Sequence, residues 1–303
     1  MVITNPHATA MTPRERDVLT HALGSDAELE VAATENRGHA AALACRAMRM
    51  GTDVVVAMGG DGTVNEVVNG LLTDGVHDGV PSLGIIPAGS TNVFARALGL
   101  PNDPIEATGV LLEALRTGAR RAVSLGQMDD RYFVFAAGMG FDAAIVGGVE
   151  RYRRRGRKST HVLYARVGVR EFFAADRRHP KLHVELSDGT RFDDIYFVIA
   201  ANADPWTFVG NRPLHPTPEV NFDTGMAVYA RRRMGTVGML WSMARMSGGT
   251  GRVGKRGAHV VHDLDGLTVI ADEPMPVQVD GDYAELRDKL TFRTVPKAIR
   301  VLV

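Results

Sequence analysis

The 303-residue chain has little cysteine, no net charge and no long apolar run. Its single cysteine, Cys45, cannot form a disulfide within the chain, which is compatible with a reducing compartment. Lysine plus arginine and aspartate plus glutamate both total 35, so no global field would draw the protein to nucleic acid or to a membrane. No segment approaches the ~20 apolar residues of a membrane span, and the N-terminus enters a strand-like segment at once. We therefore expect neither an exported nor an integral membrane protein.

The composition is that of a folded protein with real cores. Hydrophobic residues make up 45% and charged residues 23% of the chain. Because single cores stop growing near ~250–300 residues, a chain of this length fits two domains better than one.

The first third of the chain alternates β-type runs with helical patterns, which is typical of βαβ units and a parallel sheet covered by helices. Thr12, followed by Pro13 and by Glu15, predicts a helix that begins with a capping box and ends near Gly24. Further helices are expected at residues 39–50, 64–72 and 92–98. The β-type runs are residues 2–4, 29–33, 53–58 and 82–86.

Beyond about residue 123 the pattern changes to repeated β-type stretches separated by turns. This predicts an all-β second domain with one helix, at residues 160–174, whose apolar spacing indicates a core face. The expected strands are residues 132–136, 181–186, 195–201, 226–230, 259–262, 267–271 and 277–279.

One loop carries a clear chemical signal. The buried run at residues 53–58 leads into Gly59, Gly60, Asp61, Gly62 and Thr63, and a helix follows directly. Glycines let the backbone approach a ligand closely, while N–H groups and the helix dipole favour an anion, so phosphate is the natural guest. The loop lacks the lysine of a P-loop and the GxGxxG spacing of dinucleotide-binding folds. A different phosphate chemistry is therefore indicated.

The segment GGDGTVNEVVNG, residues 59–70, resembles the signature of the diacylglycerol kinase catalytic domain, which bacterial lipid kinases and sphingosine kinases share. Other segments are similar to elements of the same family: Asn5-Pro6, Thr34 before ENRGHA, PAGSTNVFAR at residues 87–96 and AGMGFDA at residues 137–143. The resemblance extends over nearly the entire chain.

This resemblance implies an ATP-dependent lipid kinase that transfers the γ-phosphate of ATP to a lipid hydroxyl, with diacylglycerol as the expected acceptor and phosphatidic acid as the product. The implied cofactors are ATP and Mg²⁺. The implied architecture is an ATP-binding α/β domain of the NAD kinase and diacylglycerol kinase kind at residues 1–123, to which a final strand at residues 291–303 returns. A β-sandwich-like lipid-substrate domain would occupy residues 124–290.

The resemblance also implies roles for individual residues. Asp282, in Val-Asp-Gly-Asp at residues 279–282, stands where the family has the acid regarded as the catalytic base, and Asp61 and Asp280 are the other predicted catalytic carboxylates. Asp223 and Met226 resemble an element that binds structural magnesium. By themselves, residues 279–282 and residues 223–226 are both typical of turns. The implied nucleotide-binding residues are Asn5, Pro6, Thr34, Gly59, Gly60, Asp61, Gly62, Thr63, Asn65, Glu66, Gly89, Ser90, Thr91 and Asn92.

Two positions depart from the family pattern. Val93 stands where an aspartate is common, and valine cannot bind a metal. Asp282 is one methylene shorter than the usual glutamate, which changes its reach by about 1.5 Å. These departures are consistent with a subgroup that has a rearranged metal network, or with lost activity.

A basic cluster begins at Arg151 and ends at Lys158, with six basic residues in eight. Such a segment gains about 1 kcal/mol per charge near anionic lipid, so it would dock the protein on the inner membrane face; a solvated loop is the equal alternative. We expect a cytoplasmic, peripheral membrane protein that does not bind nucleic acid. A homodimer is one option for an oligomeric state that the sequence leaves open. Two other functions stay open: NAD kinase, and a lipid- or nucleotide-binding module without catalysis.

Overall fold

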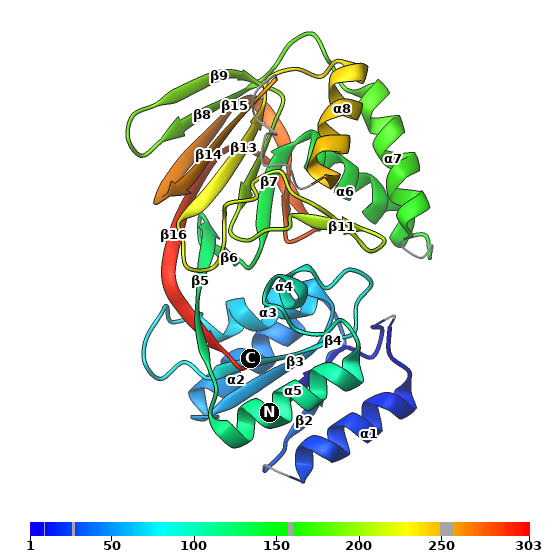
Figure 1. Ribbon diagram of the computed structural model, residues 1–303, viewed down its shortest axis with the longest axis vertical. Coiled ribbons are helices and arrows are strands. Elements are labelled where there is room, and N and C mark those ends of the chain that lie inside the picture. Colours follow the sequence, from blue (N-terminus) through cyan, green and yellow to red (C-terminus); the bar gives the residue numbers. More distant parts are fainter. Residues whose placement is uncertain (9, 26–27, 157–159, 249–256) are drawn as a thin grey trace. The chain divides into compact units, whose positions relative to one another are not determined.

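The computed structural model describes residues 1–8, 10–25, 28–156, 160–248 and 257–303. The chain divides into two compact units (Figure 1). The N-terminal unit comprises Met1–Leu125 together with Pro296–Val303, and the strand-rich unit comprises Gly126–Val295. Each unit is described by itself below.

The N-terminal unit is built on a parallel sheet in the order β4-β3-β1-β2. The end of the last strand of the chain joins it, because Val301 pairs in parallel with Leu83 of β4. Strand β3 is almost entirely buried, as its run of valines predicts for a strand covered on both faces. The strands are β1 (Val2–Thr4), β2 (Val31–Ala33), β3 (Val54–Gly59) and β4 (Ser82–Pro87).

Helices cover this sheet in two pairs, α2 with α3 and α1 with α5. The capping box predicted at Thr12 and Glu15 is confirmed, because the Thr12 side chain accepts from the Glu15 N–H and the Glu15 carboxylate accepts from the Thr12 N–H. Apolar side chains of α1 and α5 share a core with β3 and β4. The helices are α1 (Pro13–Gly24), α2 (His39–Arg49), α3 (Asp61–Leu71), α4 (Val93–Ala97) and α5 (Pro104–Thr117).

The strand-rich unit holds an antiparallel sheet in the order β14-β13-β10-β7-β15-β16, and β8 and β9 extend it from β15. Its inward-facing side chains form one large apolar core. The strands are β5 (Arg121–Met128), β6 (Arg131–Phe133), β7 (Ala136–Gly140), β8 (Leu182–Leu186), β9 (Arg191–Ile195), β10 (Phe197–Ala201), β11 (Thr207–Val209), β12 (Arg212–Leu214), β13 (Met226–Arg231), β14 (Ala258–Leu264), β15 (Gly266–Val279) and β16 (Asp282–Val301).

Within its described residues this unit also contains three helices: α6 (Phe141–Arg153), α7 (His161–Ala174) and α8 (Thr236–Ser247). The helix predicted at residues 160–174 is confirmed by α7, which Thr160 caps by accepting from the Leu163 N–H. The expectation of one helix in this part was wrong, because α6 and α8 were not predicted. Helix α6 contains Gly147 and Gly148, and glycine has a low propensity for helix interiors.

Both glycines of α6 have a packing reason. A Cβ atom on Gly147 would lie 2.8 Å from the Tyr283 ring, and one on Gly148 would lie 2.5 Å from the side chain of Val167. The helix therefore accepts two glycines because strand β16 and helix α7 approach its backbone closely.

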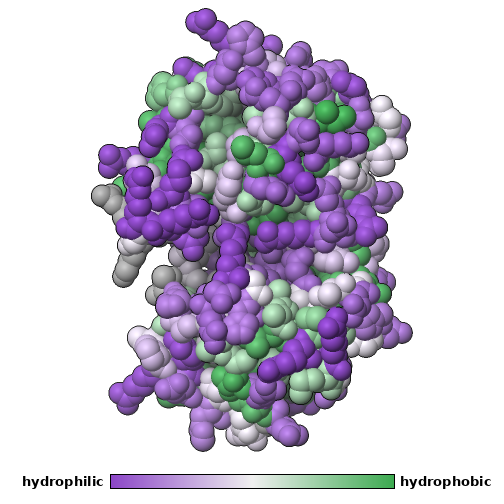
Figure 2. All heavy atoms as spheres, turned by 180° about the vertical axis from the view of Figure 1, so that it is seen from behind, coloured by the Kyte–Doolittle hydropathy of each residue, from purple (hydrophilic) through white to green (hydrophobic). Residues whose placement is uncertain are grey.

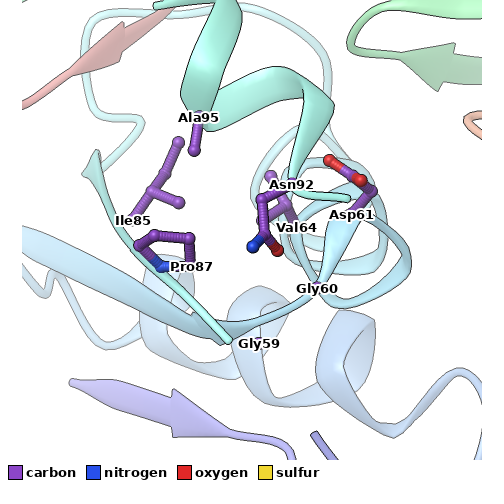
Figure 3. A pocket seen from close by; sticks show the side chains of 8 residues that line it. All are labelled: Gly59, Gly60, Asp61, Val64, Ile85, Pro87, Asn92 and Ala95. Atoms are coloured by element: carbon purple, nitrogen blue, oxygen red, sulfur yellow. The ribbon is translucent and has the colours of Figure 1, made fainter. Parts of the chain in front are cut away.

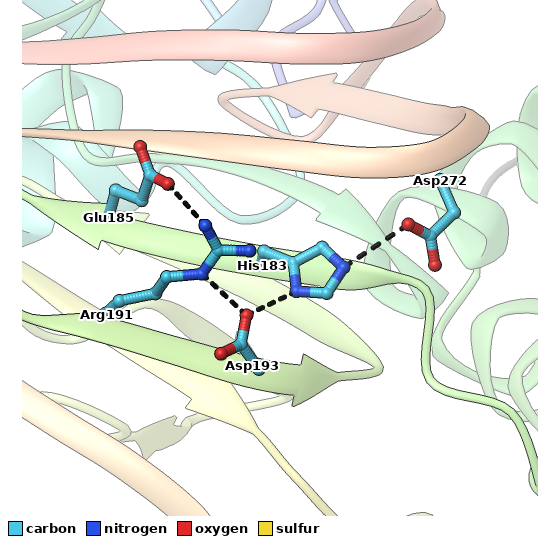
Figure 4. A network of polar contacts seen from close by, with 5 residues as sticks. All are labelled: His183, Glu185, Arg191, Asp193 and Asp272. Carbon is cyan, nitrogen blue, oxygen red and sulfur yellow. Dashed lines mark hydrogen bonds and ion pairs between the residues drawn. The ribbon is translucent and has the colours of Figure 1, made fainter.

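A polar network joins strands β8, β9 and β15 of this unit (Figure 4). His183 on β8 bonds Asp193 on β9 at 2.6 Å through Nδ1 and Asp272 on β15 at 3.3 Å through Nε2. Arg191 joins Asp193 to Glu185. Burial by itself lowers the pKa of His183, but the two aspartates outweigh it and the pKa is raised.

No helix in the described part of the chain is both long and apolar enough to span a bilayer.

Candidate active site

Residues predicted to bind nucleotide gather where β1, β3 and β4 end. Asn5, which follows β1, donates its N–H to the Met58 carbonyl on β3 at 3.0 Å, and its side-chain amide donates to the Thr63 hydroxyl at 3.3 Å. Ala88, which follows β4, donates to the Gly59 carbonyl at 2.9 Å. The carboxyl ends of adjacent parallel strands are the usual ligand position in open α/β sheets.

Two glycine loops touch each other backbone to backbone at this edge. A Cβ atom on Gly89 would lie 2.6 Å from the Cα atom of Gly60, and one on Gly60 would lie 3.1 Å from the Cα atom of Gly89. Gly59 is equally restricted, because its Cβ atom would lie 2.5 Å from the Thr63 hydroxyl. The glycines are therefore required by the contact between the loops, in addition to any approach of a ligand.

Asp61 fastens the first loop to the helix after the second. Its two carboxylate oxygens accept hydrogen bonds from the N–H groups of Val93 at 3.0 Å and Phe94 at 3.1 Å, which open α4. The carboxylate thus occupies the positive end of a helix, where negative charge is favourable. Val93 is 2% exposed, so its side chain belongs to the core and its backbone N–H is the group that Asp61 uses.

Glu66 serves the same purpose for another helix. One carboxylate oxygen accepts from the Gly38 N–H at 2.8 Å and the other from the Ala40 N–H at 3.2 Å, at the start of α2. Thr34 lies just before this segment, is buried, and donates its N–H to the Thr4 carbonyl. Asp61 and Glu66, the two acids of the glycine-loop segment, therefore both accept hydrogen bonds from backbone N–H groups.

Asn92 shapes the second loop from within. It adopts a left-handed conformation with φ 50°, and its side chain bonds both the N–H and the carbonyl of Gly89. Its amide also donates to the Asn102 side chain at 2.9 Å. Asn65 is likewise buried, whereas Pro6 and Ser90 are exposed and Thr91 is half-exposed.

A small hollow lies between the two loops and the start of α4 (Figure 3). The space between these side chains is too small to hold a water molecule, so no ligand fits inside it. The lining residues are Gly59, Gly60, Asp61, Val64, Ile85, Pro87, Asn92 and Ala95.

The residues present fit a phosphate group. Helix α3 begins at Asp61 directly after Gly60, and Gly60 accepts the first intrahelical bonds from Thr63 and Val64. The N–H groups of the first turn of a helix have no partner within the helix, and with the dipole they favour an anion. Gly60, Asp61 and Gly62 are all half-exposed, so this end of the helix is accessible.

In the strand-rich unit, Asp280 and Gly281 form the two-residue turn of the β15–β16 hairpin, in which Val279 pairs with Asp282. Both turn residues have positive φ, 49° and 77°, as such a hairpin requires. Asp280 is buried and accepts three backbone hydrogen bonds, from Val134, Phe135 and Ala136, at 2.8 to 3.1 Å. Its carboxylate therefore anchors the turn to the chain entering β7.

A second set of hydrogen bonds anchors the same turn. The side chain of Gln278 accepts from the Gly281 N–H at 3.0 Å and donates to the carboxyl of Asp142 at 2.9 Å. Gln278 and Asp142 are 2% and 7% exposed. Burial raises the pKa of Asp142 to about 7, although the hydrogen bond from Gln278 acts in the opposite direction.

Asp282 follows the anchored turn and has a different environment. Its side chain is 28% exposed and lies 3.8 Å from the guanidinium of Arg153, the last residue of α6. Its charge also acts on Tyr164 of α7, whose pKa is raised chiefly by burial. Of the three acids predicted to be catalytic, Asp61 and Asp280 accept hydrogen bonds from backbone N–H groups, whereas Asp282 lies beside the guanidinium of Arg153.

The predicted metal residues are placed differently. Asp223 lies in an exposed turn, and Met226 is fully buried at the start of β13, where its N–H donates to the Thr294 hydroxyl. Among described residues there is no group of three or more histidine, cysteine, aspartate or glutamate side chains suited to a metal ion. The structural magnesium therefore stays a prediction, with Asp223 as its one carboxylate.

The basic cluster is partly engaged in ion pairs. Arg151 pairs with Glu171 at 3.0 Å, and Arg153 and Arg154 both lie within 3.5 Å of Glu150. Arg157 and Lys158 fall outside the described residues. The described part of the cluster thus carries less uncompensated charge than its sequence suggests.

Sequence analysis did not predict two residues that support the β15–β16 turn, Gln278 and Asp142. The available signal was Gln278 itself, a polar residue inside the apolar strand run Pro-Val-Gln-Val. Strand alternation places Gln278 on the face opposite to Val277 and Val279, and because that face is buried as well, its side chain needs a buried partner.

The first part of the chain is similar to known proteins. Residues 1–128 match the family model described as "Diacylglycerol kinase catalytic domain". The predicted resemblance is confirmed for these residues. A diacylglycerol kinase of Staphylococcus saprophyticus is 43% identical over 123 residues, 40% of this chain and 38% of that protein. One of Staphylococcus aureus is 46% identical over 112 residues, 37% of this chain and 33% of that protein. The chain therefore matches little more than a third of the length of these relatives.

Solved structures extend the likeness in fold to the whole chain. A putative diacylglycerol kinase of Bacillus anthracis has a TM-score of 0.78 at 18% identity, over 99% of this chain and 93% of that one. An NAD kinase of Archaeoglobus fulgidus has a TM-score of 0.51 at 12% identity, over 100% and 92%. The expected fold class, an α/β domain followed by a strand-rich one, is confirmed.

Proposed function

We propose that this protein is an ATP-dependent lipid kinase that phosphorylates the hydroxyl of a membrane lipid, with diacylglycerol as the first candidate. The observation that carries the proposal is the pair of glycine loops in contact at Gly60 and Gly89, within a segment that matches the diacylglycerol kinase catalytic domain. The N-terminal unit is then the ATP-binding part and the strand-rich unit the lipid-binding part.

The phosphate side of the reaction requires position and charge more than covalent chemistry. When bound, ATP supplies the phosphoryl group and Mg²⁺ offsets its charge. The chain would hold the polyphosphate through the first N–H groups of α3, and Thr63 would add its hydroxyl. Because Mg²⁺ commonly keeps several waters and phosphate oxygens as ligands, it does not require a preformed cage of carboxylates. Asp61 and Glu66 support this side by fixing α4 and α2.

The acceptor side requires a base for the lipid hydroxyl. We assign that role to Asp282, whose carboxylate would take the proton as the oxygen attacks. We assign Asp280 a positioning role, because its carboxylate already accepts three backbone hydrogen bonds. The guanidinium of Arg153 lies 3.8 Å from this carboxylate, so the proposed base stands beside a positive charge.

A lipid-panel assay tests the proposal. The protein is incubated with radiolabelled ATP, Mg²⁺ and mixed micelles that contain diacylglycerol, monoacylglycerol, sphingosine or phosphatidylglycerol. We expect label in one organic-soluble lipid, and at least ~10²-fold slower labelling when Asp282→Asn replaces the wild type. Label in no lipid at any micelle composition contradicts the proposal.

NAD kinase is the second candidate, because the fold is shared with that class. It is less favoured, since residues 59–70 and 87–96 resemble the lipid branch. The same assay with NAD as acceptor distinguishes the two, because label would then appear in NADP. Nucleotide binding without any turnover would instead indicate a non-catalytic relative.

A further inference from the structure

Helix α8 is anchored in an unusual way. Only Ser242 and Met246 of its twelve residues are buried. The anchor on the sheet side is Arg231 of β13, which is 1% exposed and donates to the Ser242 hydroxyl at 2.6 Å and to the Tyr229 hydroxyl at 3.2 Å. The helix is thus held by a buried polar contact, and most of its apolar side chains do not enter the core.

Those apolar side chains are large and exposed. Val237 is 82% exposed, Leu240 64%, Met243 50% and Trp241 43%. Soluble surfaces are mostly polar, with hydrophobic groups in separate patches, as Figure 2 shows for one face of this molecule. A helix that is apolar on several sides is ordinarily buried in a core or in a membrane. Helix α8 therefore presents an apolar surface that the described chain leaves uncovered.

Helix α7 continues this surface on the same unit. Its Phe173 is 62% exposed and Val169 is 59% exposed. Arg177, just after α7, lies 5.3 Å from the ring centroid of Phe173 and donates to the Thr236 hydroxyl, which opens α8. Figure 1 shows the two helices next to each other.

The chain segment that contains α8 carries charge of one sign, although Asp176, after α7, lies close to Met234 and Gly235 at the start of the helix. From residue 226 to residue 262 the chain contains seven arginines and lysines and no aspartate or glutamate, although the whole chain is neutral. Arg232 and Arg233 are exposed just before the helix. Within it, the guanidinium of Arg245 lies 4.2 Å over the ring of Trp241. Tryptophan, other large apolar residues and arginine together are typical of helices that lie in the interface of an anionic bilayer.

We propose that α8, with the neighbouring end of α7, is the surface that docks this protein on an anionic membrane. The apolar side chains enter the boundary between headgroups and acyl chains, and the arginines meet lipid phosphates. This rests on the proposed function only in that the kinase's acceptor is a membrane lipid. It moves the docking site from the ion-paired cluster at residues 151–156 to α8.

Trp241 offers a direct probe, because the chain has only one other tryptophan, Trp206. In a Trp206→Phe protein without ATP, we expect Trp241 fluorescence to shift to the blue and to be quenched by brominated acyl chains with phosphatidylcholine/phosphatidylglycerol vesicles. Pure phosphatidylcholine vesicles should give a much smaller change. No shift with either vesicle overturns the proposal. A shift that grows with protein concentration without vesicles also overturns it, because a second copy of the chain then covers the helix.

Matched variants locate the surface. Leu240→Ser with Trp241→Ser should reduce binding to the anionic vesicles about tenfold or more, given the apolar area removed. Ile105→Ser on α5, which replaces an equally exposed apolar residue, should leave binding unchanged. Arg232→Gln with Arg233→Gln should weaken binding more than Arg154→Gln with Arg155→Gln. The reverse order would assign docking to the end of α6.

Turnover of a soluble short-chain diacylglycerol separates the two proposals. The α8 double variant should keep it while losing vesicle binding. A wild type that binds vesicles through Trp241 but phosphorylates no lipid would contradict the proposed function and leave docking standing.

Discussion

The N-terminal and strand-rich units use acidic side chains in contrasting ways. At the glycine loops both Asp61 and Glu66 accept backbone N–H groups that open helices. At the β15–β16 turn one acid, Asp280, holds backbone, and the other, Asp282, meets Arg153. A carboxylate in a glycine-rich loop or turn can thus act by positioning the chain.

The largest expected effect is on the anchored turn. Asp280→Ala would leave three buried N–H groups without their acceptor, which should lower the free energy of unfolding by roughly 3 kcal/mol or more. Urea unfolding measures it. Asp188→Ala is the matched control, because that exposed aspartate accepts from the Thr190 N–H in an ordinary turn and its loss should destabilise the protein much less. Equal losses would mean that Asp280 does not anchor the turn.

The partner acid should affect turnover and not stability. Asp282→Asn is expected to lower kcat at least ~10²-fold, the scale for loss of a general base, with ATP binding and the unfolding midpoint nearly unchanged. Steady-state kinetics with the preferred lipid, together with ATP titration, provide the measurement. Unchanged turnover would remove Asp282 from the role of base and erase the contrast with Asp280.

The buried hydrogen bond between Gln278 and Asp142, which supports the β15–β16 turn, predicts that the stability of the protein depends on pH. The pKa of Asp142 is about 7 in the folded protein and ordinarily 3.8, so the folded state binds more protons between these values. Its contribution to stability therefore falls as pH rises from about 4 to 7. Asp142→Asn, which mimics the protonated acid, should be more stable than the wild type at pH 8 and similar to it at pH 4.

Urea unfolding of both proteins at the two pH values tests this, and parallel pH profiles would contradict it. His183→Gln is a useful control. The raised pKa of His183 means that its contribution is present below about pH 6.5 and is lost as pH rises through the higher folded value. That variant should therefore be less stable than the wild type by a constant amount below pH 6.5, and the difference should shrink as pH rises above that value.

The smallest effects compare helix caps. Asp61→Ala and Glu66→Ala each remove a carboxylate from the start of a helix and should each cost about 1 kcal/mol of stability, whereas Glu15→Ala removes one from the exposed start of α1 and should cost less. Only the first should also raise the KM for ATP, by about tenfold, because α4 then no longer holds the two loops together. An equal rise in Glu15→Ala would mean that the effect is a general loss of stability.

Local patterns made much of the N-terminal unit predictable. The valine run of β3, the glycine loop and the capping box at Thr12 each depend on residues a few positions apart. The hydrogen bonds that anchor the β15–β16 turn could not be predicted, because Asp280 accepts them from residues about 145 positions away in the sequence. Helix α6 was not predicted, because its two glycines are explained only by their close contacts with Tyr283 and Val167, which are distant in the sequence. Helix α8 was missed because its apolar residues do not mark one core-facing stripe.

A structure of the protein with a non-hydrolysable ATP analogue and Mg²⁺ tests the central claim most directly. We predict that the polyphosphate lies against the first N–H groups of α3, with Gly60 and Gly89 in contact as they are here. A nucleotide bound elsewhere, with this loop pair unchanged and bare, would contradict it.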